Sequence, residues 1–318
     1  LRSLPGLAAP LESAAAKGRG QLSVDWQGGW RNPQLKASLT VPTLEVQPTS
    51  SAATTSNQLR LRDIQVSLNG RLSQAQLTAK GRADIGTRRI LLELGAEGGS
   101  NAKPLSSLSS FSSWQAIVKQ LKLSVEDPTL GAGVWRIESQ RAFHLHGIAD
   151  LIELGAGQAN LTAPTAKLGE RSTAPSQALL AWHPTRWQAG EFVTAGSLKG
   201  LPLAWLELVM GPHITSAGLM GNLIFDGEWN VASGSTLKFN AQLARSSGDL
   251  TLQAESADGV SARVAAGIRE ARLSVSVNND GGGALTAKLL WDSARAGTAE
   301  GQLRTQLKRT SASDANAQ

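Results

Sequence analysis

The sequence predicts an all-β protein built as one elongated antiparallel sheet with one or two short helices. Apolar and polar residues alternate over short runs along most of the chain, and turn-forming residues separate these runs. Side chains two residues apart lie on the same face of a strand, so each run has one apolar and one polar face. The alternation continues without a shift in composition, which favours a single elongated unit over residues 1–309.

The N-terminal half contains a series of runs with a period of two. Their apolar positions are Leu22, Val24 and Trp26; Leu35, Ala37, Leu39 and Val41; Leu59 and Leu61; Ile64, Val66 and Leu68; and Leu121, Leu123 and Val125. The phase changes between Leu61 and Ile64. Because one extra residue reverses the faces of a strand, a bulge or turn is predicted near Asp63.

Turns and helices interrupt the strands at a few places. Hairpin connections are predicted at Ser246–Asp249, Ser256–Gly259 and Asn278–Gly283, where Asn, Asp, Ser and Gly favour turns and several tolerate a positive φ. A short amphipathic helix is predicted at Pro202–Met210, because proline suits a first helical turn. A weaker helical pattern covers Phe111–Gln120.

The composition excludes several classes of function. The chain has 31 Lys and Arg against 25 Asp and Glu, giving a net charge of +6, but the basic residues are scattered. Tyrosine is absent and other aromatic residues are few, so we predict no nucleic-acid partner. The absence of cysteine excludes disulfides and thiol chemistry, and it suits an oxidising compartment such as the periplasm.

Patterns typical of catalysis or metal binding are missing or weak. The sequence has no nucleophile elbow, phosphate-binding loop or zinc-protease motif, so we predict no enzyme and no cofactor. His144 and His146 share a strand face, but the segment offers no third ligand, so we predict no metal site. Asp249 follows a glycine at the start of a strand, which predicts a backbone-capping role instead of a catalytic one.

Tryptophan side chains mark several predicted strands. Trp26, Trp135, Trp229 and Trp291 lie within strands or at their ends. A large amphipathic ring at such a position packs in a core, or alternatively lines the rim of a groove.

Three consecutive segments resemble the middle portion of the TamB-type translocation and assembly module proteins, AsmA-like members of the bridge-like lipid transfer superfamily. They are GSLKGLPLAWL at Gly196–Leu206, LIFDGEWNV at Leu223–Val231 and RSSGDLTL at Arg245–Leu252. The runs at Gly267–Val277 and Leu285–Ser293 are in keeping with them, and the likeness covers residues 182–307. The polar end at residues 310–318 is predicted to be a linker or disordered.

The resemblance implies that the sheet curves into a U-shaped, taco-like trough in the periplasm. It implies a segment of an inner-membrane-anchored protein that conducts phospholipid between the inner and outer membranes and supports outer-membrane biogenesis. The anchor, and the domain that engages an outer-membrane barrel partner of the TamA type, would lie outside this sequence. Phospholipid acyl chains would contact the inward residues Leu237, Phe239, Ala241, Leu243, Leu250, Leu252, Leu273, Val275, Val277, Leu285, Ala287, Leu289 and Trp291.

Two other functions fit an elongated sheet. A chaperone-like scaffold would pair its exposed strand edges with nascent outer-membrane strands during barrel insertion. A secreted adhesin would be built as a β-helix, whose strict repeats and Asn or Thr ladders this sequence lacks. A lipid conduit would contact its cargo through the apolar face, whereas a scaffold would contact its cargo through the backbone edges of the sheet.

Overall fold

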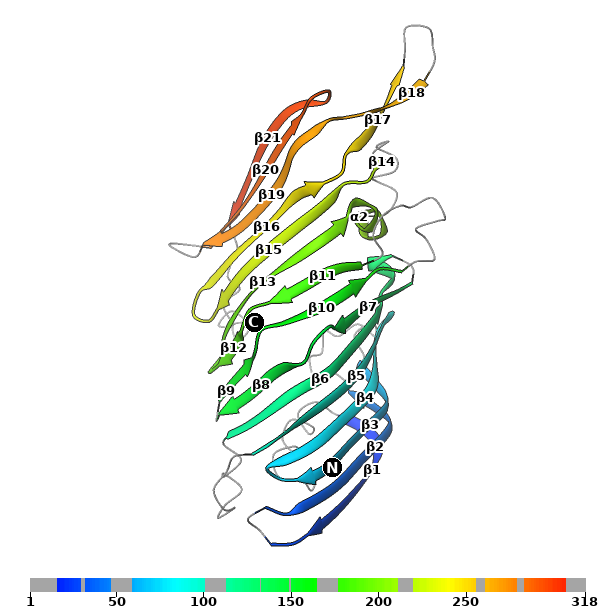
Figure 1. The fold of residues 1–318 in the computed structure, drawn as a ribbon, viewed down its shortest axis with the longest axis vertical. Helices are drawn as coiled ribbons and strands as arrows, with labels where there is room; N and C mark the ends of the chain where they lie inside the picture. The colour runs from blue at the N-terminus through cyan, green and yellow to red at the C-terminus, as the bar shows by residue number, and fades with distance from the viewer. Residues whose placement is uncertain are drawn as a thin grey trace, which may run out of the picture.

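The computed structural model describes residues 16–29, 32–46, 59–100, 113–131, 133–148, 150–164, 177–210, 220–255, 261–278 and 283–306. These residues form an 18-stranded sheet and a 3-stranded sheet, and every strand pair is antiparallel. The predicted all-β antiparallel fold is therefore confirmed. The strands follow one another along the long axis of the molecule, from the N-terminal strands at one end to the C-terminal strands at the other (Figure 1).

The N-terminal part of the large sheet is a meander of long strands. They are β1 (Ala16–Gln27), β2 (Gln34–Val46), β3 (Leu59–Arg71), β4 (Gln74–Ile85), β5 (Arg88–Ser100) and β6 (Ser113–Glu126). The register between β3 and β4 shifts between Arg62 and Gln65, and Asp63 has a φ of 53°. The bulge predicted near Asp63 is therefore confirmed.

The helix predicted at Phe111–Gln120 is wrong. The described part of this segment, residues 113–120, belongs to β6, which pairs with β5 on one side and with later strands on the other. Trp114, Ala116 and Val118 occupy alternate positions of this strand. Neighbouring strands satisfy the backbone on both sides, so tertiary pairing overrides a weak local preference for helix.

In the middle of the sheet, long strands are broken into short pairs. These are β7 (Val134–Ser139) and β8 (Phe143–Ile148), β9 (Leu151–Leu154) and β10 (Gly157–Thr162), and β11 (Gln177–Trp182) and β12 (Thr185–Gln188), preceded by the 3-10 helix η3 (Pro128–Leu130). At the breaks, Gly155 N–H donates to His144 O over 2.7 Å and His183 N–H to Ala195 O over 2.8 Å. The sheet therefore remains continuous across the broken strands.

The C-terminal part combines the end of the large sheet with the small sheet. Its elements are β13 (Glu191–Pro202), α2 (Leu203–Met210), β14 (Met220–Gly221), β15 (Ile224–Ser233), β16 (Leu237–Ser247), β17 (Leu250–Glu255), β18 (Ser261–Ala265), β19 (Ile268–Asn278), β20 (Ala284–Ser293) and β21 (Gly297–Gln306). Strands β14, β17 and β18 form the small sheet. The polar end at Thr310–Gln318 and most of the turns predicted at Ser256–Gly259 and Asn278–Gly283 lie outside the described residues.

Asp249 holds the junction at which the chain passes from the large sheet to the small one. Its Oδ1 accepts hydrogen bonds from the N–H groups of Leu250 (2.8 Å) and Ile268 (3.0 Å), and Oδ2 accepts from Gly267 N–H (2.9 Å). Its own N–H donates to Asn222 Oδ1 over 2.9 Å. Through its carboxylate and its backbone N–H, Asp249 thus joins three chain segments.

The hairpin predicted at Ser246–Asp249 is wrong, because β16 and β17 belong to different sheets. Gly248 has the positive φ, 78°, that the sequence suggested, but it redirects the chain forward instead of folding it back. Burial raises the pKa of Asp249, yet the N–H groups of Ile268, Gly267 and Leu250 and the Arg245 charge outweigh burial. The pKa of this carboxyl therefore lies below its usual value of 3.8.

The predicted helix at Pro202–Met210 is confirmed as α2, which lies at one side edge of the sheet (Figure 1). Its Trp205 is only 1% exposed, packs against Ala163 and Ala178, and meets the Trp135 ring edge to face at 5.4 Å. In the described part of the chain, no helix has the length and apolarity needed to span a bilayer.

Three tryptophan rings lie over glycines directly opposite them on neighbouring strands. The pairs are Trp114–Gly147, Trp182–Gly157 and Trp229–Gly196. A Cβ atom added at any of these glycines would come within 2.3 Å of the ring. The missing side chain therefore gives the ring its place on the sheet.

We expect Gly196→Ala to lower the free energy of unfolding by about 2 kcal/mol. The new methyl group would lie 2.2 Å from Trp229 Cζ2 and 2.4 Å from the Ala181 carbonyl oxygen, so the ring or the backbone must move. Gly301→Ala is the control, because its Cβ would meet Leu289 Cβ at 4.0 Å, an ordinary contact. Urea unfolding of both variants measures the difference, and equal stabilities would contradict this account of the tryptophan–glycine pairs.

Candidate functional site

One face of the large sheet is apolar from one edge strand to the other. A single line of facing residues crosses it, and we call this line the central row: Leu22, Leu39, Val66, Ala79, Leu94, Leu121, Ser139, Ala159, Leu180, Leu198, Gly227, Leu243, Leu273, Leu289 and Gly301. Apart from Ser139, Gly227 and Gly301, every member is Leu, Val or Ala. Neighbouring strands are about 4.8 Å apart, so the row extends for roughly 67 Å.

Most of the predicted lining residues lie on this apolar face. In β16, Phe239, Ala241 and Leu243 face Val277, Val275 and Leu273 of β19, and these face Leu285, Ala287 and Leu289 of β20. Leu237, the first residue of β16, lies on the same face. Trp291 of β20 also lies on it, opposite Ala271 of β19. The structure therefore brings together, on one surface, residues that the sequence placed in separate runs.

The two remaining predicted residues, Leu250 and Leu252, belong to β17 of the small sheet. Leu250 is 3% exposed, in a cluster with Leu203, Leu223 and Ala271. Leu252 is partly buried against the same cluster, as is Trp291. Leu250 is thus a core residue that joins the small sheet to the apolar face.

The apolar face is buried in some places and open in others. Its buried members, each at most 8% exposed, are Leu35, Val41, Ala75, Ala96, Val118, Phe143, Ala159, Ala178, Ala271 and Val277. Toward the C-terminal edge, Leu289 is 47% exposed and Leu303 is 64% exposed. Large apolar side chains that remain open in a row of this length are typical of a surface that contacts an apolar partner.

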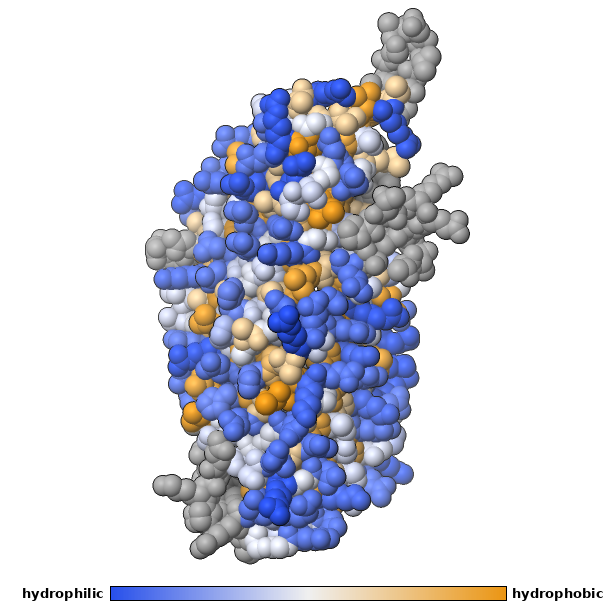
Figure 2. Space-filling view, viewed as in Figure 1, coloured by the Kyte–Doolittle hydropathy of each residue, from blue (hydrophilic) through white to orange (hydrophobic). Residues whose placement is uncertain are grey.

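The opposite face of the sheet is polar. Lys238, Ser274 and Lys288 lie on it, next to Phe239, Val275 and Leu289 on the apolar face, in agreement with the predicted phase. Figure 2 shows hydrophilic side chains over most of the visible surface, with hydrophobic side chains in scattered patches.

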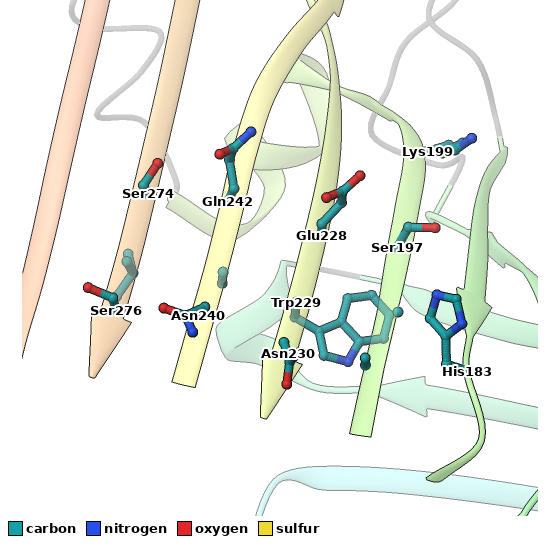
Figure 3. A pocket seen from close by; sticks show the side chains of 14 residues that line it. His183, Ser197, Lys199, Glu228, Trp229, Asn230, Asn240, Gln242, Ser274 and Ser276 are labelled. Atoms are coloured by element: carbon teal, nitrogen blue, oxygen red, sulfur yellow. The ribbon is translucent and has the colours of Figure 1, made fainter. Parts of the chain in front are cut away.

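Hollows of about 600 and 530 Å³ lie on the polar face of the described residues. In the larger, polar side chains project from neighbouring strands β13, β15, β16 and β19, among them Ser197, Glu228, Gln242 and Ser274 (Figure 3). Trp229 contributes to the lining, although it is in phase with the apolar face. The hollow offers mostly uncharged hydrogen-bonding groups.

The charges of the N-terminal half are ordered on the polar face, which the scattered basic residues of the sequence did not reveal. A row of facing residues alternates in sign across neighbouring strands: Lys17, Glu45, Arg60, Asp84, Arg89 and Glu126. Arg60 pairs with Glu45 over 3.0 Å, and Arg89 pairs with Glu126 over 2.9 Å. Only the strand register brings these residues together, so a single sequence offers no signal for them.

The two neighbouring histidines and the four strand tryptophans lie on opposite faces of the large sheet. His144 and His146 are on the polar face, with Phe143 and Leu145 on the other. Among the described residues, no three His, Asp or Glu side chains are grouped closely enough to hold a metal ion. Trp26, Trp135, Trp229 and Trp291 are all in phase with the apolar face.

The arrangement separates an apolar surface, able to hold hydrocarbon, from a polar surface that water can solvate. No protein-family model, curated protein or solved structure matches the chain.

Proposed function

We propose that this chain is a periplasmic segment of an envelope-spanning, TamB-type protein that conducts phospholipid between the inner and outer membranes. The observation that supports this most strongly is the central row, a path across the whole large sheet that is uncharged and, apart from Ser139, apolar. An acyl chain of about 16 carbons in water costs on the order of 12 kcal/mol, at about 0.8 kcal/mol per CH₂. A continuous surface of Leu, Val and Ala removes most of this barrier along the path.

We propose further that the sheet bends along its length into a trough with the apolar face inward. Support comes from the burial of Val118, Phe143 and Ala159, which are at most 4% exposed on a face of a single sheet. A sheet buries such side chains when it curves toward itself or is covered by other elements. The Phe143 and Trp182 rings meet at 5.3 Å because Trp182 lies over Gly157 on the strand between them, and this contact helps to bury Phe143.

The length of the path supports movement along it over storage of a single lipid. The roughly 67 Å of the central row is about twice the 30 Å hydrocarbon thickness of a bilayer. A lipid chain therefore covers only part of the row. Because the row has no charged member, a chain meets no desolvated charge as it moves from strand to strand.

The alternative function, a scaffold for inserting outer-membrane barrel proteins, has an observation of its own. Within the described residues, β1 pairs only with β2, and β21 pairs only with β20. All ten residues of β21 are exposed. Its outer backbone groups are placed to accept a further strand by augmentation.

A photo-reactive residue at Phe239, compared with one at Lys238, tests the proposed function. We expect the Phe239 probe to capture phospholipid in cells and the Lys238 probe to capture none, because the two side chains lie on opposite faces of β16. Mass spectrometry of the adducts identifies the captured species. Since the positions are adjacent in the chain, they share the same expression level and location.

Other outcomes of this experiment would change the conclusion. Protein adducts at both positions, with no lipid at either, would overturn the conduit and favour the scaffold. Equal lipid capture at both positions would show adsorption to lipid without a preferred face, which also contradicts the conduit.

A further inference from the structure

Exposed apolar side chains gather at one side edge of the sheet, at hairpin ends of its interior strands. Trp187, which is 56% exposed, faces both Ile152 and Phe192, each of which is 39% exposed. Phe192 faces Ser233, which in turn faces Leu237, exposed by 37%. We call Ile152, Trp187, Phe192 and Leu237 the lip.

The lip is continuous with the apolar face. Phe192 and the central-row residue Leu198 are separated by six positions of β13, so they lie on the same face. Leu237 and the central-row residue Leu243 have the same relation in β16. Along β16, where Phe239 and Ala241 lie between Leu237 and Leu243, an apolar group at the lip can move onto the central row without crossing a polar side chain.

The opposite side edge of the apolar face is covered, in the middle of the sheet, by helix α2. Helix α2 buries Trp205 against Trp135, Ala163 and Ala178 there, and the Trp135 Nε1–H donates to the Leu130 carbonyl of η3 over 2.9 Å. Further along, the cluster of Leu203, Leu223 and Leu250 joins the small sheet to this edge. The apolar face is thus closed beside α2 and open at the lip.

We infer that the lip is the lateral opening through which an acyl chain moves onto and off the apolar face, while its headgroup stays outside. This inference rests on the proposed function. Acyl chains fit the lip because its side chains are apolar and aromatic and because they lead directly to the central row. The paired aromatic rings supply rigid apolar surface at the water boundary, where such side chains are favoured.

Charges beside the lip favour a zwitterionic headgroup. On the polar face of the same strand ends, Arg186 lies opposite Glu153, and Lys238 and Glu191 stand at neighbouring hairpin ends. The two cations suit a phosphate, and the two carboxylates suit an ammonium group. An anionic headgroup has a phosphate for the cations but no ammonium group for the two carboxylates.

An added β-strand does not fit at the lip. The strands that carry it are interior strands, because β12 pairs with β9 and β13, β13 with β15, and β15 with β16. Their backbone groups are already used in the sheet, so augmentation is confined to the edge strands. An occupant of the lip must therefore bind through side-chain surface.

The test combines two probe positions with two substitutions in the full chain. Vesicles of phosphatidylethanolamine are mixed with the purified protein carrying a photo-reactive residue at Phe192 or at Phe239. We expect lipid adducts at both probes, and we expect Trp187→Asp to reduce capture at Phe239 about tenfold, because a chain that enters at the lip must then pass a charge. Val193→Asp is the matched control: it lies on the opposite face of the same hairpin, is similarly exposed, and should change capture by less than about twofold.

The outcomes separate this inference from the proposed function. If lipid is captured at Phe239, but not at Phe192, and Trp187→Asp leaves capture unchanged, the lip is not the opening and the conduit stands. If the wild-type protein captures no lipid at Phe239, both conclusions are overturned. Adducts at Phe192 that join two copies of the chain, with no lipid adducts there, would make the lip a contact between copies and overturn the inference. Equal capture from phosphatidylglycerol vesicles would overturn the headgroup preference. Thermal unfolding of Trp187→Asp and Val193→Asp checks that both variants are folded.

Discussion

Val275→Asp is expected to reduce lipid capture and transport at least about a hundredfold, a factor that corresponds to about 2.8 kcal/mol. Val275 lies on the apolar face between Ala241 and Ala287 of the neighbouring strands. A carboxylate there has no basic partner directly opposite it and must be desolvated by each passing acyl chain, which costs several kcal/mol. We expect only a modest loss of expression, because Val275 is only partly buried. The measurement is transfer of labelled phospholipid between donor and acceptor vesicles.

Ser274→Asp is the matched control for this experiment. Ser274 precedes Val275 in β19 but lies on the polar face, opposite Lys288. The same charge placed there meets water and a basic neighbour, so transfer should stay close to that of the wild-type protein. Wild-type transfer in Val275→Asp would rule out the apolar face as the path of the lipid.

Asp249→Asn is expected to lower the free energy of unfolding by about 2 to 4 kcal/mol. The carboxylate accepts hydrogen bonds from Leu250, Gly267 and Ile268, and an amide offers one acceptor oxygen where the carboxylate offers two. At least one part-buried N–H loses its partner, at about 1–3 kcal/mol, and the remaining bonds lose their charge assistance. Urea unfolding at neutral pH measures the change, with the exposed Asp25→Asn as control.

The Asp249 carboxylate also makes the free energy of unfolding depend on pH. Because the pKa of Asp249 is lowered in the folded state, its contribution is present above the unfolded value of 3.8 and is lost as the pH falls through the folded pKa. The wild-type protein should therefore lose stability below about pH 4, by more than the Asp249→Asn variant does. A stability difference between the two proteins that stays constant from neutral pH into this acid range would contradict the assigned role of the carboxylate.

Much of the local structure could be predicted from the sequence. Alternation with period two places residues such as Phe239 and Val275 on one face, because the face of a strand residue depends only on its position along the strand. The phase change before Ile64 revealed the bulge at Asp63, and the Pro202 start revealed α2. These features depend on residues close together in the chain.

Predictions failed where distant pairing controls the local structure. Residues 113–120 join a strand because β5 and β8 flank them, and Gly248–Asp249 continues the chain forward because Asn222, Gly267 and Ile268 bind Asp249. The predicted lining residue Leu250 is buried for the same reason. In each case the partner lies far away in sequence.

The sequence by itself determined the all-β class, the two-faced strands and the apolar character of one face. Only the tertiary structure decided that this face runs as one row from Leu22 to Gly301, and that it is covered at α2 but open at the lip. The physical reason is the range of the interactions involved. Alternation is a property of neighbouring residues, whereas register and coverage depend on hydrogen bonds and packing between segments that the sequence does not place side by side.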